Sequence, residues 1–377
     1  MTDDTLISPN KVGLYIHIPF CRSKCPYCDF ISYVGKEPLM DEYVSCIIRE
    51  ASYYHGIKAD TVFIGGGTPS CLPRGFIIKM MEGIRKHIDI TDDAEFTIEA
   101  NPNSFLPDTA CEYRDAGCTR LSLGLQSASD RLLKRIGRIH TKDDFSRAFS
   151  NAVNAGISNI NADIMYSLPG ETESDIYDTL GFLDNYPLTH ISAYSLIIEE
   201  GTPFYDDLQS GRITAADDEH DRSTFKTISE HLRKKGLSRY EISNFSVPGM
   251  ECAHNLKYWR RKEYIGLGVS AYSFLNEERF GNCSSLEEYI RDISEGKAAV
   301  SYRDDRVDPL FEELMLGTRL TEGIRKSLIS DRGILDSLER SGLIHVTDDR
   351  IILTEKGMDI QDSIVISLSD HLEKSVI

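Results

Sequence analysis

Residues 13–30 read Gly-Leu-Tyr-Ile-His-Ile-Pro-Phe-Cys-Arg-Ser-Lys-Cys-Pro-Tyr-Cys-Asp-Phe, and they decide how the rest of the 377-residue chain is interpreted. Leu14, Ile16 and Ile18 occupy alternate positions, which is the period of a β-strand. Pro19 ends this strand, because proline has no amide hydrogen to donate to a neighbour. The cysteines that follow therefore lie in a loop at the carboxyl end of the first predicted strand.

Three cysteines, Cys21, Cys25 and Cys28, have the spacing C-x3-C-x2-C. Thiolates this close together can surround a metal centre, and a [4Fe–4S] cube usually takes four of them. With no fourth ligand nearby, one iron would stay open to a small molecule. A structural zinc site would want a fourth Cys or His, and only His17 lies close by in the sequence. A disulfide is disfavoured because the sequence has the character of an intracellular protein, and disulfides are rare in such proteins. The spacing therefore favours an iron–sulfur site over these two alternatives.

The composition is that of an ordinary globular protein, with 41% hydrophobic and 27% charged residues. The net charge of −18 argues against broad nucleic-acid binding, which depends on neutralising phosphates. The chain has no apolar run long enough for a transmembrane segment, and the start Met-Thr-Asp-Asp does not resemble a signal peptide. We therefore expect a cytoplasmic protein. The six cysteines outside the triplet are expected to be small core residues.

Predicted strands and helices alternate through the first half of the chain. The strands start near residues 13, 61, 95, 120, 160 and 190, and the helices cover 39–55, 73–88, 107–116, 143–155 and 172–184. This alternation implies a parallel α/β sheet with right-handed crossovers, either an open, incomplete barrel or a doubly wound sheet. In both folds, ligands gather at the carboxyl ends of the strands. The unusual polar clusters of this chain all follow such strand ends.

The alternation breaks in the second half of the chain. Two segments starting at Arg239 and Tyr264 are predicted as added strands that flank a loop. Two short helices, at 308–317 and 331–341, and a hairpin over 343–353 then predict a winged-helix-like module. The charges of the second helix nearly cancel, so nucleic acid is not expected as a partner. We predict three segments, which are 1–235, 236–300 and 301–377.

The cysteine spacing, with Tyr27 just before the third cysteine, resembles the signature of the radical S-adenosylmethionine (SAM) superfamily. That resemblance implies a partial (β/α)6 barrel in which SAM chelates the open iron of a [4Fe–4S] cluster. One electron from the cluster then cleaves SAM to a 5′-deoxyadenosyl radical. The wider string from Tyr15 to Cys21, Tyr-Ile-His-Ile-Pro-Phe-Cys, resembles one branch of the superfamily. This branch contains the oxygen-independent coproporphyrinogen III oxidases and the HemW-type heme chaperones.

The turn Gly65-Gly-Gly-Thr-Pro-Ser follows the second predicted strand, where a backbone without Cβ atoms can approach a ligand closely. By itself it is equally typical of a tight turn. The resemblance implies that Gly66, Gly67 and Thr68 receive the amino group of SAM and that Tyr15 helps to place it. Glu99, at the end of the third strand, would accept hydrogen bonds from ribose hydroxyls, although an ordinary surface Glu would fit the sequence too.

The resemblance also implies roles for Tyr27, Gln126, Arg138 and Asp163, which would surround a second SAM or the substrate end of the pocket. An arginine can hold a carboxylate through two hydrogen bonds, so Arg138 is a candidate for a methionine carboxylate or a porphyrin propionate. The alternative for Arg138 is an ordinary charge on a helix surface.

Two features separate the branches. The oxidases carry a fourth cysteine two positions after the third, where this chain has Phe30. The segment from Cys252, Cys-Ala-His-Asn-Leu-Lys-Tyr-Trp, matches the H-N-x-x-Y-W motif of the chaperones. His254 would ligate heme iron through a neutral imidazole, and Tyr258 and Trp259 would stack on the macrocycle. The alternative is a buried polar corner with His254 hydrogen-bonded and Trp259 in the core.

The sequence therefore predicts a HemW-type heme chaperone that binds a [4Fe–4S] cluster, SAM and heme and passes heme to acceptor hemoproteins. Its expected partners include an electron donor such as flavodoxin or ferredoxin, and membrane association is expected only through an acceptor. The competing prediction is an oxygen-independent coproporphyrinogen III oxidase, which decarboxylates two propionates to vinyl groups. A zinc-held structural domain is the third alternative.

Overall fold

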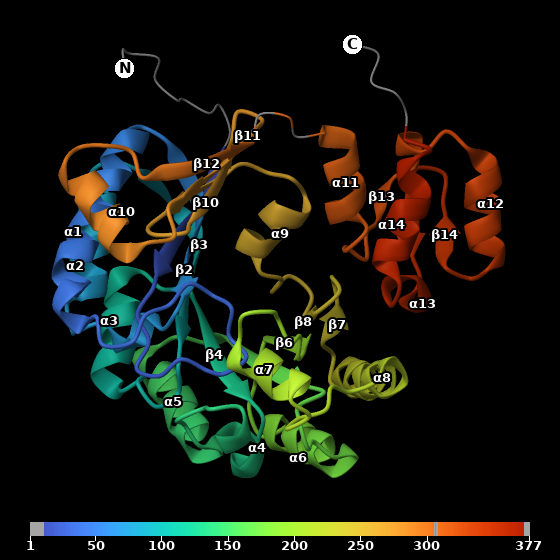
Figure 1. Ribbon diagram of the computed structural model, residues 1–377, viewed down its shortest axis with the longest axis horizontal. Helices are drawn as coiled ribbons and strands as arrows, with labels where there is room; N and C mark the ends of the chain where they lie inside the picture. Colours follow the sequence, from blue (N-terminus) through green and yellow to red (C-terminus); the bar gives the residue numbers. More distant parts are fainter. Residues whose placement is uncertain (1–10, 305, 307, 373–377) are drawn as a thin grey trace.

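A computed structural model describes residues 11–304, 306 and 308–372. One mixed sheet of twelve strands runs through most of these residues in the order β12-β11-β10-β9-β1-β2-β3-β4-β5-β6-β8-β7 (Figure 1). The central six strands are parallel, and they are β1 (Val12–Ile18), β2 (Lys58–Gly66), β3 (Asp89–Ala100), β4 (Arg120–Gln126), β5 (Asn159–Tyr166) and β6 (His190–Ser195). This arrangement confirms the predicted partial (β/α)6 barrel.

Helices cover the outer face of the curved sheet. They are α1 (Met40–Ala51), α2 (Phe76–Ile84), α3 (Pro107–Ala116), α4 (Asp130–Arg135), α5 (Lys142–Ala155) and α6 (Glu173–Leu183). Strand β4 is buried along its whole length, as expected of a parallel strand that is covered on both faces. Capping boxes start two of the helices, one from Thr141 with Asp144 and one from Thr172 with Asp175.

Two helices are shorter than predicted, and α2 is shorter at both ends, since it stops at Ile84 and not at residue 88. Helix α1 stops at Ala51 and continues only as a 3-10 turn through Tyr54, so the predicted helix 39–55 is too long. Helix α2 begins at Phe76 because Gly75 precedes it with a φ of 88°, outside the helical region. Helix α4 was not predicted at all.

The added strands extend both edges of the parallel sheet. On one side, β9 (Tyr264–Leu267) pairs parallel with β1 and is followed by an antiparallel series, β10 (Tyr272–Leu275), β11 (Glu278–Asn282) and β12 (Val300–Asp304). On the other side lie β8 (Asn244–Ser246) and β7 (Ser238–Arg239). The helices of this region are α7 (Pro203–Gln209), α8 (Asp218–Lys234), α9 (Ala253–Trp259) and α10 (Leu286–Ser294).

Helix α9 occupies the segment predicted as a loop. Its first amides are capped from outside by Glu95 of β3, whose carboxylate accepts from the N–H groups of Ala253 and His254, both at 3.0 Å. A cap supplied from such a distant part of the chain leaves no local sequence signal.

The C-terminal module has its own hydrophobic core and a three-stranded sheet of order β13-β15-β14. Its elements are α11 (Pro309–Gly317), β13 (Ile324–Arg325), α12 (Arg332–Arg340), β14 (Ile344–Val346), β15 (Arg350–Leu353), α13 (Glu355–Met358) and α14 (Gln361–Ser369). Helices followed by an antiparallel hairpin confirm the predicted winged-helix-like arrangement. Within the described residues, none of the helices has the length and apolar character needed to span a membrane.

Candidate functional site

A cavity of about 560 Å³ lies at the carboxyl ends of the parallel strands. Most of the predicted site residues line it, namely Cys21, Cys25, Tyr27, Cys28, Gly66, Gly67, Thr68, Glu99, Gln126, Arg138 and Asp163. These residues come from five different strand ends and from the loop after α4, so the fold brings together what the sequence separates.

The cysteine loop leaves β1 and is anchored at both ends. The Cys21 amide donates to the Tyr33 carbonyl at 3.0 Å, and the Tyr33 amide donates to the Pro19 carbonyl at 2.7 Å. Cys21, Cys25 and Cys28 are partly buried free thiols. In the described part of the chain, no three His, Cys, Asp or Glu side chains converge in the way that a single metal ion requires. A cube differs from a single ion because each thiolate binds its own iron, so this donor set fits a [4Fe–4S] cluster with one corner left for another ligand.

The glycine turn packs directly against the cysteine loop. The Gly67 amide donates to the Ile18 carbonyl, and the Thr68 amide donates to the Phe20 carbonyl, both at 2.8 Å. A Cβ on Gly67 would lie 2.8 Å from both of these carbonyl oxygens. Only glycine allows the two backbones to come this close. The two hydrogen bonds then hold the glycine turn against the cysteine loop at the wall of the cavity.

Glu99 faces the same turn from the end of β3. Its Oε2 accepts from the Gly66 amide at 3.2 Å. Burial, and next the negative charge of Asp163, raise the pKa of Glu99 to about 7. The Glu99 carboxyl group therefore gains a proton more readily than an exposed glutamate, and it lines the cavity as a hydrogen-bonding group.

Polar side chains from β4 and β5 and from the loop after α4 complete the wall. Asp163 accepts from Ser122 Oγ and from Asn161 Nδ2, both at 2.8 Å. Arg138 Nε donates to the Tyr27 hydroxyl at 3.0 Å, so this arginine points into the cavity and is not a surface charge. Gln126 is buried with a φ of 66°, a backbone conformation that non-glycine residues adopt mainly where the surroundings enforce it.

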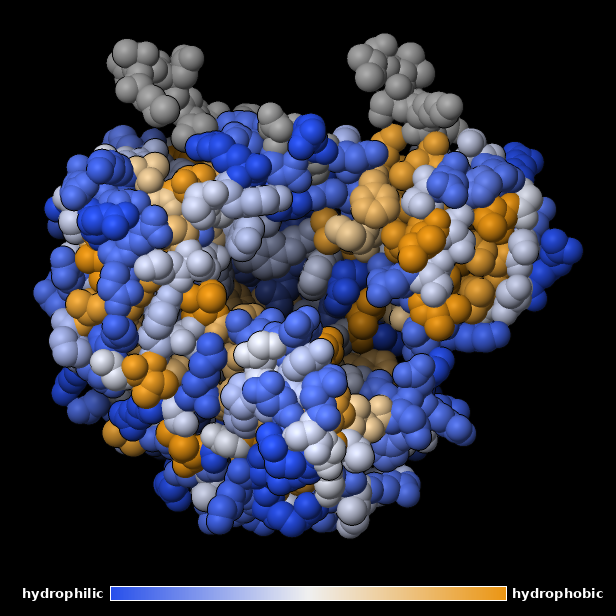
Figure 2. Space-filling model, in the orientation of Figure 1, coloured by the Kyte–Doolittle hydropathy of each residue, from blue (hydrophilic) through white to orange (hydrophobic). Residues whose placement is uncertain are grey.

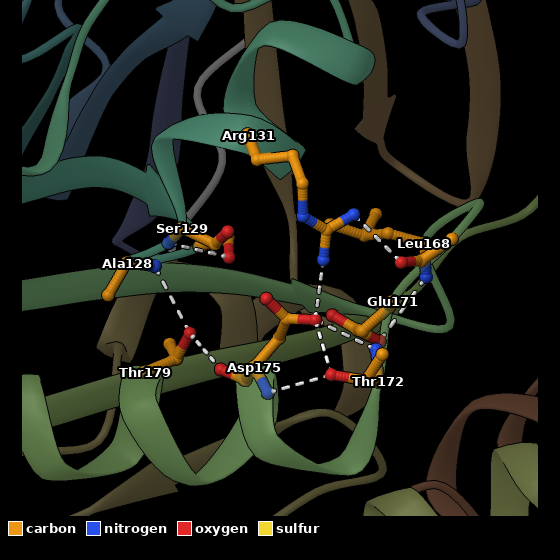
Figure 3. A network of polar contacts seen from close by, with 10 residues as sticks. Ala128, Ser129, Arg131, Leu168, Glu171, Thr172, Asp175 and Thr179 are labelled. Carbon is orange, nitrogen blue, oxygen red and sulfur yellow. Dashed lines mark hydrogen bonds and ion pairs between the residues drawn. The ribbon is translucent and has the colours of Figure 1, made fainter.

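Arg138 is positioned by α4, the helix that the sequence did not reveal. Arg131 of this helix donates to the Gly170 carbonyl, in the loop after β5, at 2.9 Å. Figure 3 shows its second contact, to Asp175 in the first turn of α6, at 2.7 Å. The Ala128 amide donates to Thr179 Oγ1 at 3.1 Å, which fixes the segment before α4. Long-range contacts, not helical periodicity, hold this short helix in place.

Tyr15 lies behind the cavity wall, and the cavity does not reach it. Its hydroxyl contacts His17 Nδ1 at 2.9 Å, while His17 Nε2 contacts the Ile31 carbonyl at 2.8 Å. The His17 ring fills the space next to Gly66, where an added Cβ would lie 2.4 Å from it. His17 was missed as a site residue, although Tyr15 and His17 share one face of β1 and that alternation was visible in the sequence.

The H-N-x-x-Y-W segment forms α9, away from the cavity. His254 is 1% exposed, with Nδ1 2.9 Å from Thr61 Oγ1 and Nε2 2.8 Å from the Tyr258 hydroxyl. Burial, and next the charge of Lys257, lower its pKa to about 3. Trp259 is half-buried at the end of the helix. His254 thus lies in a buried polar corner, and an axial role for it stays a prediction that requires the Tyr258 contact to open.

Comparison with known proteins gives a consistent family. The family model described as "Radical SAM superfamily" matches residues 15–183. The protein named heme chaperone HemW from Bacillus subtilis is 33% identical, covering 91% of this chain and 95% of that protein. Proteins of the same name from Mycobacterium tuberculosis and Escherichia coli are 31% and 35% identical, covering 94% and 88% of this chain and 94% and 89% of their own length.

A solved structure shows the same fold over nearly the whole chain. Coproporphyrinogen III oxidase (HemN) from Escherichia coli, a radical SAM enzyme, superimposes with a TM-score of 0.83 at 21% identity, covering 95% of this chain and 90% of that chain. The likeness extends through the added strands and the C-terminal module. From its relatives and its fold, the chain belongs to the radical SAM superfamily and, within it, to the family of the heme chaperone HemW.

Proposed function

We propose that this protein is a heme chaperone, which binds a [4Fe–4S] cluster, SAM and heme and delivers heme to acceptor hemoproteins. The observation that carries this proposal is that relatives named heme chaperone match the chain almost from end to end. The cavity supports it further, because Phe30 lines the wall beside Cys28 where the related oxidases have a fourth cysteine.

Within the cavity, Cys21, Cys25 and Cys28 would hold the cluster. A reduced cluster of this kind supplies one electron to the sulfonium of bound SAM. Around it, Gly66, Gly67 and Thr68 would receive the SAM amino group through the turn that packs on the cysteine loop. Glu99 would accept from the ribose hydroxyls, and Tyr15 would act from behind the wall by holding His17 against the turn.

The far side of the cavity would bind the polar ends of ligands. Arg138, already hydrogen-bonded to Tyr27, would hold a carboxylate, while Gln126 and Asp163 would accept or donate at its edge. Because the Arg138 guanidinium is already held by the Tyr27 hydroxyl, it would need little reorganisation when the ligand arrives.

Heme would dock on α9, where Tyr258 and Trp259 provide aromatic surface. Figure 2 shows a hollow between the barrel and the C-terminal module, at the place that α9 occupies in Figure 1. A site that opens onto such a hollow can release its ligand, as a carrier must. An electron donor such as flavodoxin or ferredoxin would serve the cluster, and the protein would work in the cytoplasm, reaching a membrane only through an acceptor.

An anaerobic heme titration tests this function. Wild type, His254→Ala and the matched control His220→Ala, which alters an exposed histidine of α8, are titrated with and without SAM after cluster reconstitution. We expect saturable binding by wild type and the control, and an altered heme absorption spectrum with weaker binding in His254→Ala. Absence of saturable binding in wild type would refute the proposal.

The oxidase is tested in parallel with the same reconstituted protein. Coproporphyrinogen III, SAM and a reductant are supplied under anaerobic conditions, and porphyrinogen products are separated by chromatography. A chaperone leaves coproporphyrinogen III unchanged, whereas formation of protoporphyrinogen IX would replace our proposal with the catalytic alternative.

A further inference from the structure

The end of α9 packs against the C-terminal module, and one of the contacts between them is a stacked pair. The Arg319 guanidinium, in the turn after α11, lies over the Trp259 ring with its carbon 4.4 Å from the ring centroid. Helices α9 and α11 are neighbours in Figure 1, and they contact each other in the structure. Arg319 therefore belongs to the C-terminal module but reaches the proposed heme surface.

Arg319 is poorly paired for an arginine in such a position. Its nearest anionic atom is Glu241 Oε2 at 3.7 Å, which is too far for a hydrogen bond. Among the described residues, Arg319 Nε, Glu241 Oε2 and Trp259 Nε1 are all buried without a hydrogen-bond partner. Three such atoms on Arg319 and the two residues it contacts are unusual, because each has lost hydration without gaining a hydrogen bond.

The neighbouring arginines are different. Arg260 binds Glu322 through two hydrogen bonds of 2.9 Å, and Arg261 binds Glu312 at 2.8 Å. Glu241 is also held without Arg319, since its Oε1 accepts from the Ser243 amide at 2.8 Å and from Asn244 Nδ2 at 2.6 Å. Arg319 can thus turn to another anion while Glu241 keeps the two hydrogen bonds of its Oε1.

We propose that Arg319 is the carboxylate-binding residue of the heme site and holds a heme propionate while the macrocycle packs on Tyr258 and Trp259. This inference rests on the proposed binding of heme at α9. The guanidinium has the planar fork that pairs with a carboxylate, and it has no competing hydrogen bond to give up among the described residues. It also supplies local positive charge for an anionic ligand on a chain whose net charge is −18.

The test uses the fact that Trp259 is the only tryptophan. Ferric heme and its dimethyl ester, in which both propionates are blocked, are titrated against the full-length protein while tryptophan fluorescence is followed. The variants are Arg319→Gln, Arg319→Lys and the control Arg340→Gln, which removes an exposed charge from α12 of the same module.

We expect ferric heme to quench the fluorescence of wild type and Arg340→Gln with equal affinity. Arg319→Gln should bind it about 10- to 100-fold more weakly, and Arg319→Lys should lie between, since one charge-assisted contact is lost or weakened. The dimethyl ester should bind wild type and Arg319→Gln alike.

Three results would overturn the inference while leaving the chaperone function standing: unchanged affinity of Arg319→Gln for ferric heme, equal weakening of ferric heme and ester, or equal affinity of wild type for both ligands. The last comparison needs no variant, so it decides the matter even if Arg319→Gln does not fold. If wild type shows no saturable binding of either ligand, the proposed function itself fails.

Discussion

Replacing Gly66 by alanine should destabilise the protein through two separable effects. Gly66 has a φ of 107°, a conformation that residues with a Cβ rarely adopt. An added Cβ would also lie 2.4 Å from two atoms of the His17 ring. The ring cannot easily move aside, because both of its nitrogens are engaged, one by the Tyr15 hydroxyl and one by the Ile31 carbonyl.

The size of each effect follows from the structure. A positive φ costs an alanine about 1–2 kcal/mol relative to glycine. Forcing a methyl group into a filled space adds about 1–3 kcal/mol. Gly66→Ala should therefore lower the free energy of unfolding by about 2–5 kcal/mol. Gly75→Ala is the matched control, since Gly75 has a φ of 88° but no atom within 4 Å of an added Cβ.

Equilibrium urea denaturation of the apo-protein, followed by circular dichroism, measures both variants. The free energy of unfolding of Gly75→Ala should fall only by the cost of the positive φ. That of Gly66→Ala should fall further, by the cost of the steric clash with His17. In a His17→Ala background the extra loss at Gly66 should shrink, because the three nearest atoms to the added Cβ all belong to that ring. Equal destabilisation at the two glycines, or no relief from His17→Ala, would refute the reasoning.

Three further predictions concern the site and its supports. Cys25→Ser should fail to take up iron and sulfide in anaerobic reconstitution, whereas Cys71→Ser should bind them as wild type does; equal loss in both would remove the cluster assignment. Glu99, with its pKa raised from 4.5 to about 7, contributes stability that is complete below pH 4.5 and is lost as the pH rises toward 7. Between pH 4.5 and 7, the free energy of unfolding of Glu99→Gln should therefore fall by about 1–3 kcal/mol less than that of wild type. Identical pH profiles of the two proteins in denaturation experiments would contradict this. Thr61→Val leaves His254 Nδ1 without its partner and should cost about 1–3 kcal/mol in the free energy of unfolding, so an unchanged urea midpoint would argue against that hydrogen bond.

The sequence was informative for site residues that come directly after a predicted parallel strand. The carboxyl ends of such strands meet at one edge, so Cys21, Gly66 and Glu99 could be expected to converge, and the cavity confirms that they do. Arg138 is part of the same cavity, although its supporting helix was invisible. The division of the chain at residues 235 and 300 stays a prediction.

What could not be predicted depends on distant partners. Helix α4 is held by contacts from Arg131 to Asp175, and α9 is capped by Glu95 of a strand far upstream. Neither helix carries a local cap or a long apolar period, and these are the signals that sequence reasoning uses. The enclosed state of His254 depends on Thr61, which no local pattern connects to it.

The pairing of β1 with β9 has a consequence for biosynthesis. Strand β1 leads into the cysteine loop, yet one of its two edges is covered only by residues 264–267, which leave the ribosome much later. Until then, that edge presents unpaired amides and carbonyls to other chains. In a nascent chain, the strand that carries the cysteine loop would therefore lack one of its two neighbours. Assembly of the iron–sulfur cluster should be efficient only after β9 has been translated.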